Sequence, residues 1–252
     1  MRLLFILCFA SLSLAGPLHA QEYEAPTGTR MKEKKERPKT RPKKNQDDAE
    51  ARLLVNRFGK CIFDRRKEQS VQLLSVSDYK AIDYQNLGSG EFILTNQVLM
   101  DDCLGRARRG GITGMAMTFS NIVLRNALTE AAYLDTYSKR ETPIEISEDA
   151  PEFLANRFFV QGATYEDARV SASLADCVVH REPALAHAIL YTKPGSDDEK
   201  EAVMAIVPAV SGCIPSGIEL RLNVKSIRAF VADGLWARIY YGKLAGNSEG
   251  SD

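Results

Sequence analysis

Residues 54–62, LVNRFGKCI, and residues 170–178, VSASLADCV, carry the pattern that decides the fold. In both stretches, apolar side chains and one cysteine occupy positions i, i+4, i+7 and i+8, which form one face of an α-helix. The two stretches lie 116 residues apart, and an apolar pair at 73–74 recurs at 189–190 with the same offset. The chain therefore contains an internal repeat that opens with a cysteine-bearing helix.

The repeat continues through a second cysteine and a short alternating segment. Cys103 and Cys213 lie 110 residues apart, so the two copies differ in the length of the preceding loop. After them, apolar and polar residues alternate over residues 115–119 and 218–222, which predicts one short strand in each copy.

A final amphipathic helix closes each copy. Ser120 and Asn223 are candidate N-caps of these helices, and Thr164 with Asp167 predicts a capping box at the start of the second cysteine helix. Five positions of the final helix correspond at an offset of 103 residues. They are Leu124, Arg125, Leu128, Glu130 and Tyr133 in the first copy, and Ile227, Arg228, Val231, Asp233 and Trp236 in the second.

We therefore predict a mainly α protein with two similar disulfide-stapled helical units, each with one short strand before its last helix. The expected organisation is a signal peptide (1–20), a disordered basic arm (21–45), helical unit 1 (46–140), a linker (141–150), helical unit 2 (151–245) and a flexible tail (246–252). A rival register pairs residues 54–58 with 154–158 at an offset of 100. The first register is preferred because it aligns the cysteines.

The first 20 residues have the features of a secretory signal. Arg2 is followed by an apolar run over residues 3–15, and Ala20 offers a small residue at the cleavage site. The run is too short to span a bilayer, which disfavours the alternative of a retained anchor, and no later stretch is long and apolar enough to do so. We expect a soluble periplasmic or secreted protein.

Export determines how the cysteines are interpreted. Without Cys8 of the signal, Cys61, Cys103, Cys177 and Cys213 remain, an even number that favours two disulfides in an oxidising compartment. Four cysteines allow three pairings, and only the repeat favours Cys61 with Cys103 and Cys177 with Cys213. A zinc site or a redox pair is the alternative, but no two cysteines have the C-x-x-C spacing.

The formal net charge of zero conceals a basic arm and an acidic body. Residues 30–44 hold nine Lys or Arg and two Glu, a net charge of +7, whereas the chain from Asn45 onward has 23 basic and 29 acidic residues. The arm has almost no apolar residue, so we expect disorder. It is either a solvated spacer or an attachment to an anionic envelope component or envelope protein. Nucleic acid is not the expected partner, since residues 30–44 offer no aromatic side chain for stacking.

The candidate chemistry is sparse. His180, Glu182 and His187 are weak candidates for a hydrolase site, and surface histidines are the favoured alternative. The chain has no G-x-S-x-G, H-E-x-x-H or P-loop motif, and we expect no cofactor and no metal.

Arg125 and Arg228 are the strongest candidates for a contact site. Each precedes an acid, Glu130 or Asp233, by five residues, which places the two side chains about 140° apart on one helix and disfavours pairing within it. Capping contacts or salt bridges between the units are the favoured interpretation. The alternative is a shared groove in which the two arginines meet an anion.

The second unit resembles a family of exported proteins. The segments CVVHREPALAHAIL, PGSDDEK, CIPSGIELRLN and SIRAFVADGLW are similar to uncharacterised exported alphaproteobacterial proteins with duplicated two-cysteine helical units. The likeness covers about 70 residues and is faint in the first unit, which lacks the PGS turn. The resemblance implies bacterial export and assigns no activity.

Together these features predict a non-enzymatic binding or assembly module of the cell envelope. The alternative is a periplasmic hydrolase with its site between the two units.

Overall fold

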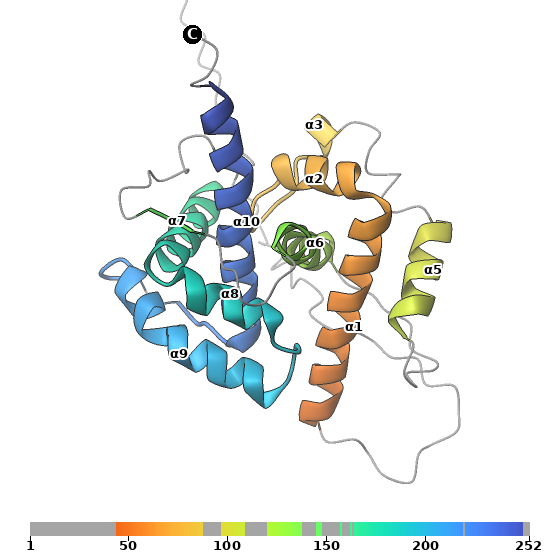
Figure 1. Ribbon diagram of the computed structural model, residues 1–252, viewed down its shortest axis with the longest axis horizontal. Coiled ribbons are helices and arrows are strands. Elements are labelled where there is room, and N and C mark those ends of the chain that lie inside the picture. The colour runs from red at the N-terminus through yellow and green to blue at the C-terminus, as the bar shows by residue number, and fades with distance from the viewer. Residues whose placement is uncertain are drawn as a thin grey trace, which may run out of the picture.

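The computed structural model describes residues 44–87, 97–108, 120–137, 145–147, 157, 162, 164–218 and 220–248. Within these ranges the first unit holds α1 (Lys44–Arg65), α2 (Lys67–Ser75), α3 (Tyr84–Leu87), α5 (Gln97–Ala107) and α6 (Asn121–Thr136). The second unit holds α7 (Tyr165–Arg181), α8 (Pro183–Tyr191), α9 (Asp197–Cys213) and α10 (Val224–Ser248). The predicted mainly α fold is confirmed (Figure 1).

The helices follow the predicted repeat, and both predicted disulfides are present. The first cysteine of each unit lies on α1 or α7, and the second lies on α5 or α9. Cys61 is bonded to Cys103 with a Cα–Cα distance of 5.5 Å, and Cys177 to Cys213 with one of 5.9 Å. Each bond stays within its unit, so the structure has the register that aligns the cysteines.

The predicted strand before α10 is wrong. Residues 218 and 220–222 form no strand, and the only β feature among the described residues is an isolated bridge between Ser77 and Ile82. Leu220 and Leu222 are half-buried against the second core, while Ile218 and Arg221 are exposed. Alternating burial is therefore limited to residues 220–222, and no strand among the described residues pairs with this segment. The equivalent prediction at residues 115–119 lies outside the described residues.

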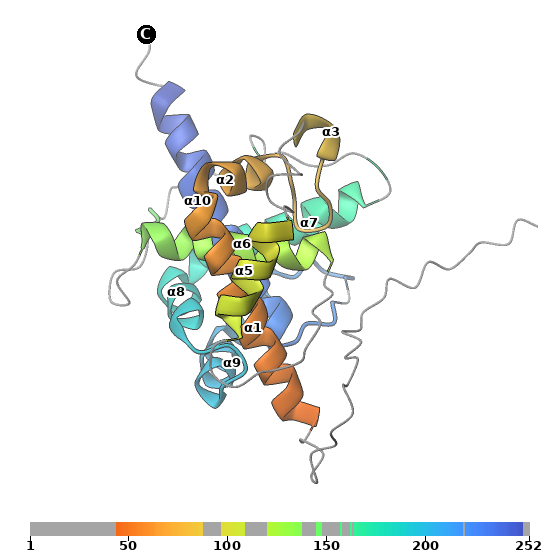
Figure 2. The ribbon, with the colours of Figure 1, turned by 90° about the vertical axis from the view of Figure 1, so that its right-hand side faces the viewer.

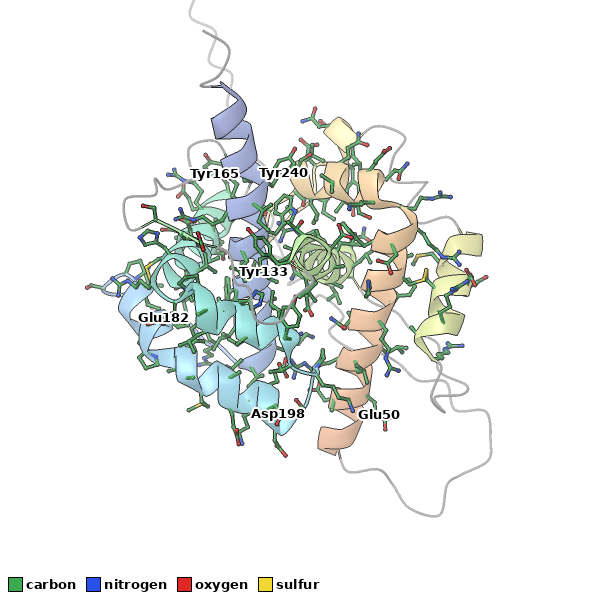
Figure 3. All side chains as sticks on the ribbon, viewed as in Figure 1. Glu50, Tyr133, Tyr165, Glu182, Asp198 and Tyr240 are labelled. Carbon is green, nitrogen blue, oxygen red and sulfur yellow. A yellow bond between two sulfur atoms is a disulfide. The ribbon has the colours of Figure 1, made fainter. Side chains whose placement is uncertain are left out.

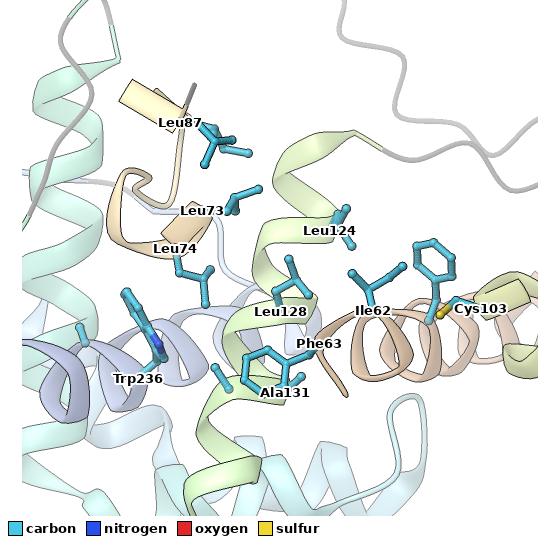
Figure 4. Packing of buried hydrophobic residues seen from close by; sticks show 14 of the residues in the cluster. Ile62, Phe63, Leu73, Leu74, Leu87, Cys103, Leu124, Leu128, Ala131 and Trp236 are labelled. Atoms are coloured by element: carbon cyan, nitrogen blue, oxygen red, sulfur yellow. The ribbon is translucent and has the colours of Figure 1, made fainter. Parts of the chain in front are cut away.

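Helices α6 and α10 are shared between the two units. One core contains Leu74 and Leu128 of the first unit together with Trp236 from α10 (Figure 4). The other core contains Ile189 of the second unit together with Tyr133 from α6. In Figure 1, α6 is seen end on between α1 and α10, and in Figure 2 it crosses behind α1. Each unit thus contributes a long helix that completes the hydrophobic core of the other.

Glycine permits close packing of the first and last helices in both units. A Cβ on Gly59 of α1 would lie 2.5 Å from the Cβ of Ala127 on α6, and a Cβ on Gly234 of α10 would lie 2.6 Å from the carbonyl oxygen of Ala175 on α7. Gly59 and Ala175 are equivalent in the repeat. The glycine therefore lies on the first helix of the first unit and on the last helix of the second unit.

Capping explains where several helices begin. Ser120 accepts a hydrogen bond from the backbone of Val123, Ser196 from that of Glu199, and Asn223 from that of Ser226. The predicted caps at Ser120 and Asn223 are confirmed. The capping box at Thr164 is wrong, because its side chain makes no cap hydrogen bond.

The described residues begin within the predicted arm and end within the predicted tail. The signal peptide and nearly all of the basic arm lie outside the described residues; the last two arm residues, Lys44 and Asn45, open α1. At the other end α10 continues to Ser248 and so includes the start of the predicted tail. No helix in the described ranges has the length and apolarity of a membrane span.

Candidate functional site at the interface of the units

Two arginines bind acids of the opposite unit in a crosswise arrangement. Arg125 of α6 is fully buried, and its Nη1 lies 2.5 Å from Oδ1 of Asp233 on α10. Arg228 of α10 donates from Nε and Nη2 to the two carboxylate oxygens of Glu130 on α6, at 2.9 and 2.7 Å. The same two repeat positions supply the arginine and the acid in both units. This reciprocity is what an isologous contact about a twofold axis produces, here between two halves of one chain.

Each arginine also reaches the end of the second helix in its own unit. Arg228 donates to the carbonyl oxygens of Ile189 and Leu190 on α8, at 2.8 and 3.0 Å. Arg125 donates from Nε to Oγ of Ser77 at 3.2 Å, and Ser77 donates to the carbonyl oxygen of Leu74 on α2. The last carbonyls of a helix lack intrahelical partners and carry partial negative charge, so a cation there is stabilising.

Glu199 extends the network to α1. Its buried carboxylate accepts from Arg228 at 3.2 Å, from Arg52 of α1 at 2.5 Å, and from the backbone N–H of Gly195 at 2.8 Å. Asn56 of α1 donates to Glu130 at 2.6 Å. The turn before α9 is thereby fixed against the first unit.

Arg157 extends the network at Asp233. It donates to Oδ2 of Asp233 and is also under the electrostatic influence of Asp78, which is fully buried. The network contains Arg52, Arg125, Arg157 and Arg228, and Asp78, Glu130, Glu199 and Asp233. Among these eight side chains, four positive charges thus face four negative ones.

In these ion pairs, the opposite charges outweigh the effect of burial on the pKa values. Burial alone would raise the pKa of Asp233, but the charges of Arg125 and Arg157 outweigh it and hold that pKa below its usual range. Burial alone would lower the pKa of Arg228, but Glu130 and Glu199 outweigh it and raise that pKa. Burial, assisted by the negative charge of Asp233, raises the pKa of Tyr79 to about 12. Arg228 and Asp233 are therefore ionised at neutral pH, and Tyr79 is neutral.

The predicted hydrolase residues do not meet the network. His187 of α8 is 2 % exposed, and its Nδ1 is hydrogen-bonded to the hydroxyl of Tyr133 at 2.6 Å (Tyr133 is labelled in Figure 3). His180 is half-buried in the last turn of α7, and Glu182 is exposed between α7 and α8. No contact among the described residues joins these three side chains. His187 thus supports the packing of α8 on α6.

The part of the chain that the structure describes shows no metal cluster, and a small apolar pocket lies in the second core. No group of three or more metal-ligating side chains occurs in the described ranges. A pocket beside Leu174, Ile227 and Phe230 is lined only by apolar side chains and has room for about one water molecule.

The chain was compared with known families, curated proteins and solved structures. No match was found in any of the three.

Sequence reasoning located half of this network. Arg125, Arg228, Glu130 and Asp233 are selected by their equal positions in the repeat. Arg52, Arg157 and Asn56 were missed, since their partners lie far away in the sequence. Glu199 lies three residues after Ser196, a spacing that indicates helix capping. This spacing gives no information about the ion pair with Arg52.

Gly195 offers a direct test of the contact between the units. Its φ is +81°, and a Cβ there would lie 2.5 Å from the Cβ of Ala49 on α1. Gly195→Ala is expected to lower the free energy of unfolding by about 2–4 kcal/mol, because it combines backbone strain with a clash. Gly217→Ala is the control, with a φ of +84° and nothing within 4 Å, and should lose only about 1–2 kcal/mol. Equal losses in urea denaturation would show that the turn does not pack against α1.

Proposed function

We propose that this protein is an exported, non-enzymatic binding or assembly module of the cell envelope, in which basic residues 30–44 attach a rigid two-unit body to an anionic envelope component. The observation that carries the proposal is the closed network between the units. Its charges are paired and buried, so they hold the two units together and are not available for catalysis. The strong charge surplus lies instead in residues 30–44, which have a net charge of +7.

Three further features support this role. Both disulfides suit an oxidising compartment, as export would require. α1 begins at Lys44, so the arm joins the body through the helix that carries Arg52 and Asn56. A load on the arm would therefore be transmitted to both units. A cation-rich segment gains roughly 1 kcal/mol per Lys or Arg held close to an anionic membrane surface, which is enough for attachment when several act together.

The alternative, a hydrolase with its site between the units, lacks a supporting observation. The interface that would hold the site is filled by paired arginines and acids. His180, Glu182 and His187 do not converge there.

The tether is tested by neutralising the arm. Changing the eight Lys and Arg residues of 30–43 to Gln should move the protein from the envelope fraction to the soluble fraction, with at least about a tenfold loss of affinity. A shuffled arm of the same composition is the matched control and should retain binding, because attraction to a charged surface depends little on residue order. Binding of the native protein should weaken as salt shortens the range of the attraction. Unchanged fractionation of the Gln variant would rule out the tether.

A further inference from the structure

The two disulfides occupy equivalent positions but differ in exposure. Cys61–Cys103 joins α1 to α5, Cys177–Cys213 joins α7 to α9, and Figure 3 shows the two bonds on opposite sides of the molecule. Cys103 is fully buried, which shields one sulfur of the first bond. Cys177 and Cys213 are both half-buried, so a small reagent can approach the second bond from either residue.

The charges beside the first disulfide are neutralised locally. Arg65, in the last turn of α1, places Nη1 2.5 Å from Oδ2 of Asp102, the residue before Cys103. Asp64, three residues after Cys61, accepts from Lys60 at 2.9 Å. An incoming anionic thiolate therefore meets acids as well as cations.

The second unit keeps the arginine and lacks both acids. In the repeat, Arg65 corresponds to Arg181, Asp64 to His180, and Asp102 to Gly212. The guanidinium of Arg181 lies against Gly212, and a Cβ there would be 2.7 Å from its Nη1. No ion pair or side-chain hydrogen bond joins Arg181 to another described residue.

Neighbouring acids do not compensate for this difference. Asp176, the residue before Cys177, is buried and bound through both oxygens by Arg238 at 2.6 Å. Glu182 is exposed at the end of α7. The half-buried bond between Cys177 and Cys213 therefore has an arginine with no bound carboxylate on the side of Gly212.

We propose that Cys177–Cys213 is a thiol–disulfide exchange site whose substrates are anionic thiols, and that Arg181 is its positioning residue. A thiolate attacks the Cys177 sulfur and forms a mixed disulfide, while the bond to Cys213 breaks and Cys213 leaves with the electron pair as a thiolate. A second thiolate then attacks the external sulfur of the mixed disulfide and releases Cys177 as a thiolate. The two thiolates together supply two electrons, and they leave as a disulfide. Arg181 attracts the anionic reagent and stabilises the Cys213 thiolate.

Exchange at this bond would act on α9. Glu199 anchors the N-terminal end of α9 to Arg52 and Arg228, and the disulfide anchors its C-terminal end to α7. Reduction releases only the second anchor, so the unit interface stays intact while the end of α9 is freed. This reactivity is independent of the proposed envelope tether.

The experiment measures site-resolved reduction of the full oxidised chain. The protein is incubated at neutral pH with a negatively charged thiol, 2-mercaptoethanesulfonate, or a positively charged one, cysteamine. Samples are quenched by alkylation and mapped by peptide mass spectrometry. Cys177–Cys213 is expected to react about tenfold faster than Cys61–Cys103 with the anionic thiol, because of its exposure and its uncompensated arginine.

The variant Arg181→Gln separates an electrostatic role from a structural one. It should slow reduction of Cys177–Cys213 by the anionic thiol about fivefold and by cysteamine much less. Lys200→Gln is the control: it removes an equal charge from an exposed position on α9, about 20 Å along the helix from Cys213. Equal reduction rates for the two disulfides would overturn the exchange site. Equal behaviour of the two variants, or an Arg181 effect that is the same for both thiols, would overturn the role of Arg181.

Discussion

Replacing Arg228 with methionine is expected to lower the free energy of unfolding by about 3–5 kcal/mol, a large share of the stability of a domain of this size. Methionine retains much of the side-chain volume but removes the charge that pairs with Glu130 and the donors to the carbonyls of Ile189 and Leu190. Glu130 would keep only its hydrogen bond from Asn56 and would remain buried as an uncompensated anion. The loss would be measured by urea denaturation followed by circular dichroism.

Three further variants make this measurement interpretable: Arg221→Met, Glu130→Met, and the double variant of Arg228→Met with Glu130→Met. Arg221→Met removes an exposed arginine just before α10 and should change stability by less than about 0.5 kcal/mol. Adding Glu130→Met to Arg228→Met should restore part of the loss, because an apolar pair leaves no unpaired charge. Strictly additive losses in this double-mutant cycle would show that the two side chains do not act as a pair.

Much of the fold follows from local patterns in the sequence. The apolar spacing around Cys61 and Cys177 specifies two equivalent helices, and the repeat selects one of three disulfide pairings, which the structure confirms. The strand at residues 218–222 was predicted incorrectly for a physical reason. Alternating burial is a property of any extended segment that lies on a core, whereas a strand also needs a neighbouring backbone to supply hydrogen bonds.

The candidate site was only partly predictable, because partner choice depends on how the units dock. The five-residue spacing of Arg125 and Glu130 disfavours pairing within α6, and the same holds for Arg228 and Asp233 within α10. Those spacings indicate that partners must be sought elsewhere. They do not indicate that Arg52 reaches Glu199, which lies 147 residues away in the sequence. This contact joins α1 to α9, depends on how the two units dock, and leaves no periodic signal in the sequence.

Replacing Asp233 with asparagine is expected to cost about 3–5 kcal/mol at neutral pH and to flatten the acid limb of the stability profile. The substitution leaves Arg125 and Arg157 facing a neutral amide in a fully buried site. Asparagine is nearly isosteric with aspartate, so the substitution leaves no cavity. The loss of stability reflects the missing negative charge and the replacement of an acceptor oxygen by an N–H donor.

The sign of the pH dependence follows from the lowered pKa of Asp233, because Arg125 and Arg157 favour its ionised form more than burial disfavours it. The unfolded chain binds this proton near the ordinary pKa of about 4, whereas the folded chain resists binding it until lower pH. The stabilisation is therefore fully present above about pH 4 and is lost as the pH falls through the folded pKa. Stability of the native protein should decline over this range, and Asp233→Asn should decline less, so the two profiles should converge in acid. Asp198→Asn, at an exposed position of α9, is the control and should keep the native profile. Parallel profiles for the native protein and Asp233→Asn would show that Asp233 is not the charge that links the unit interface to pH.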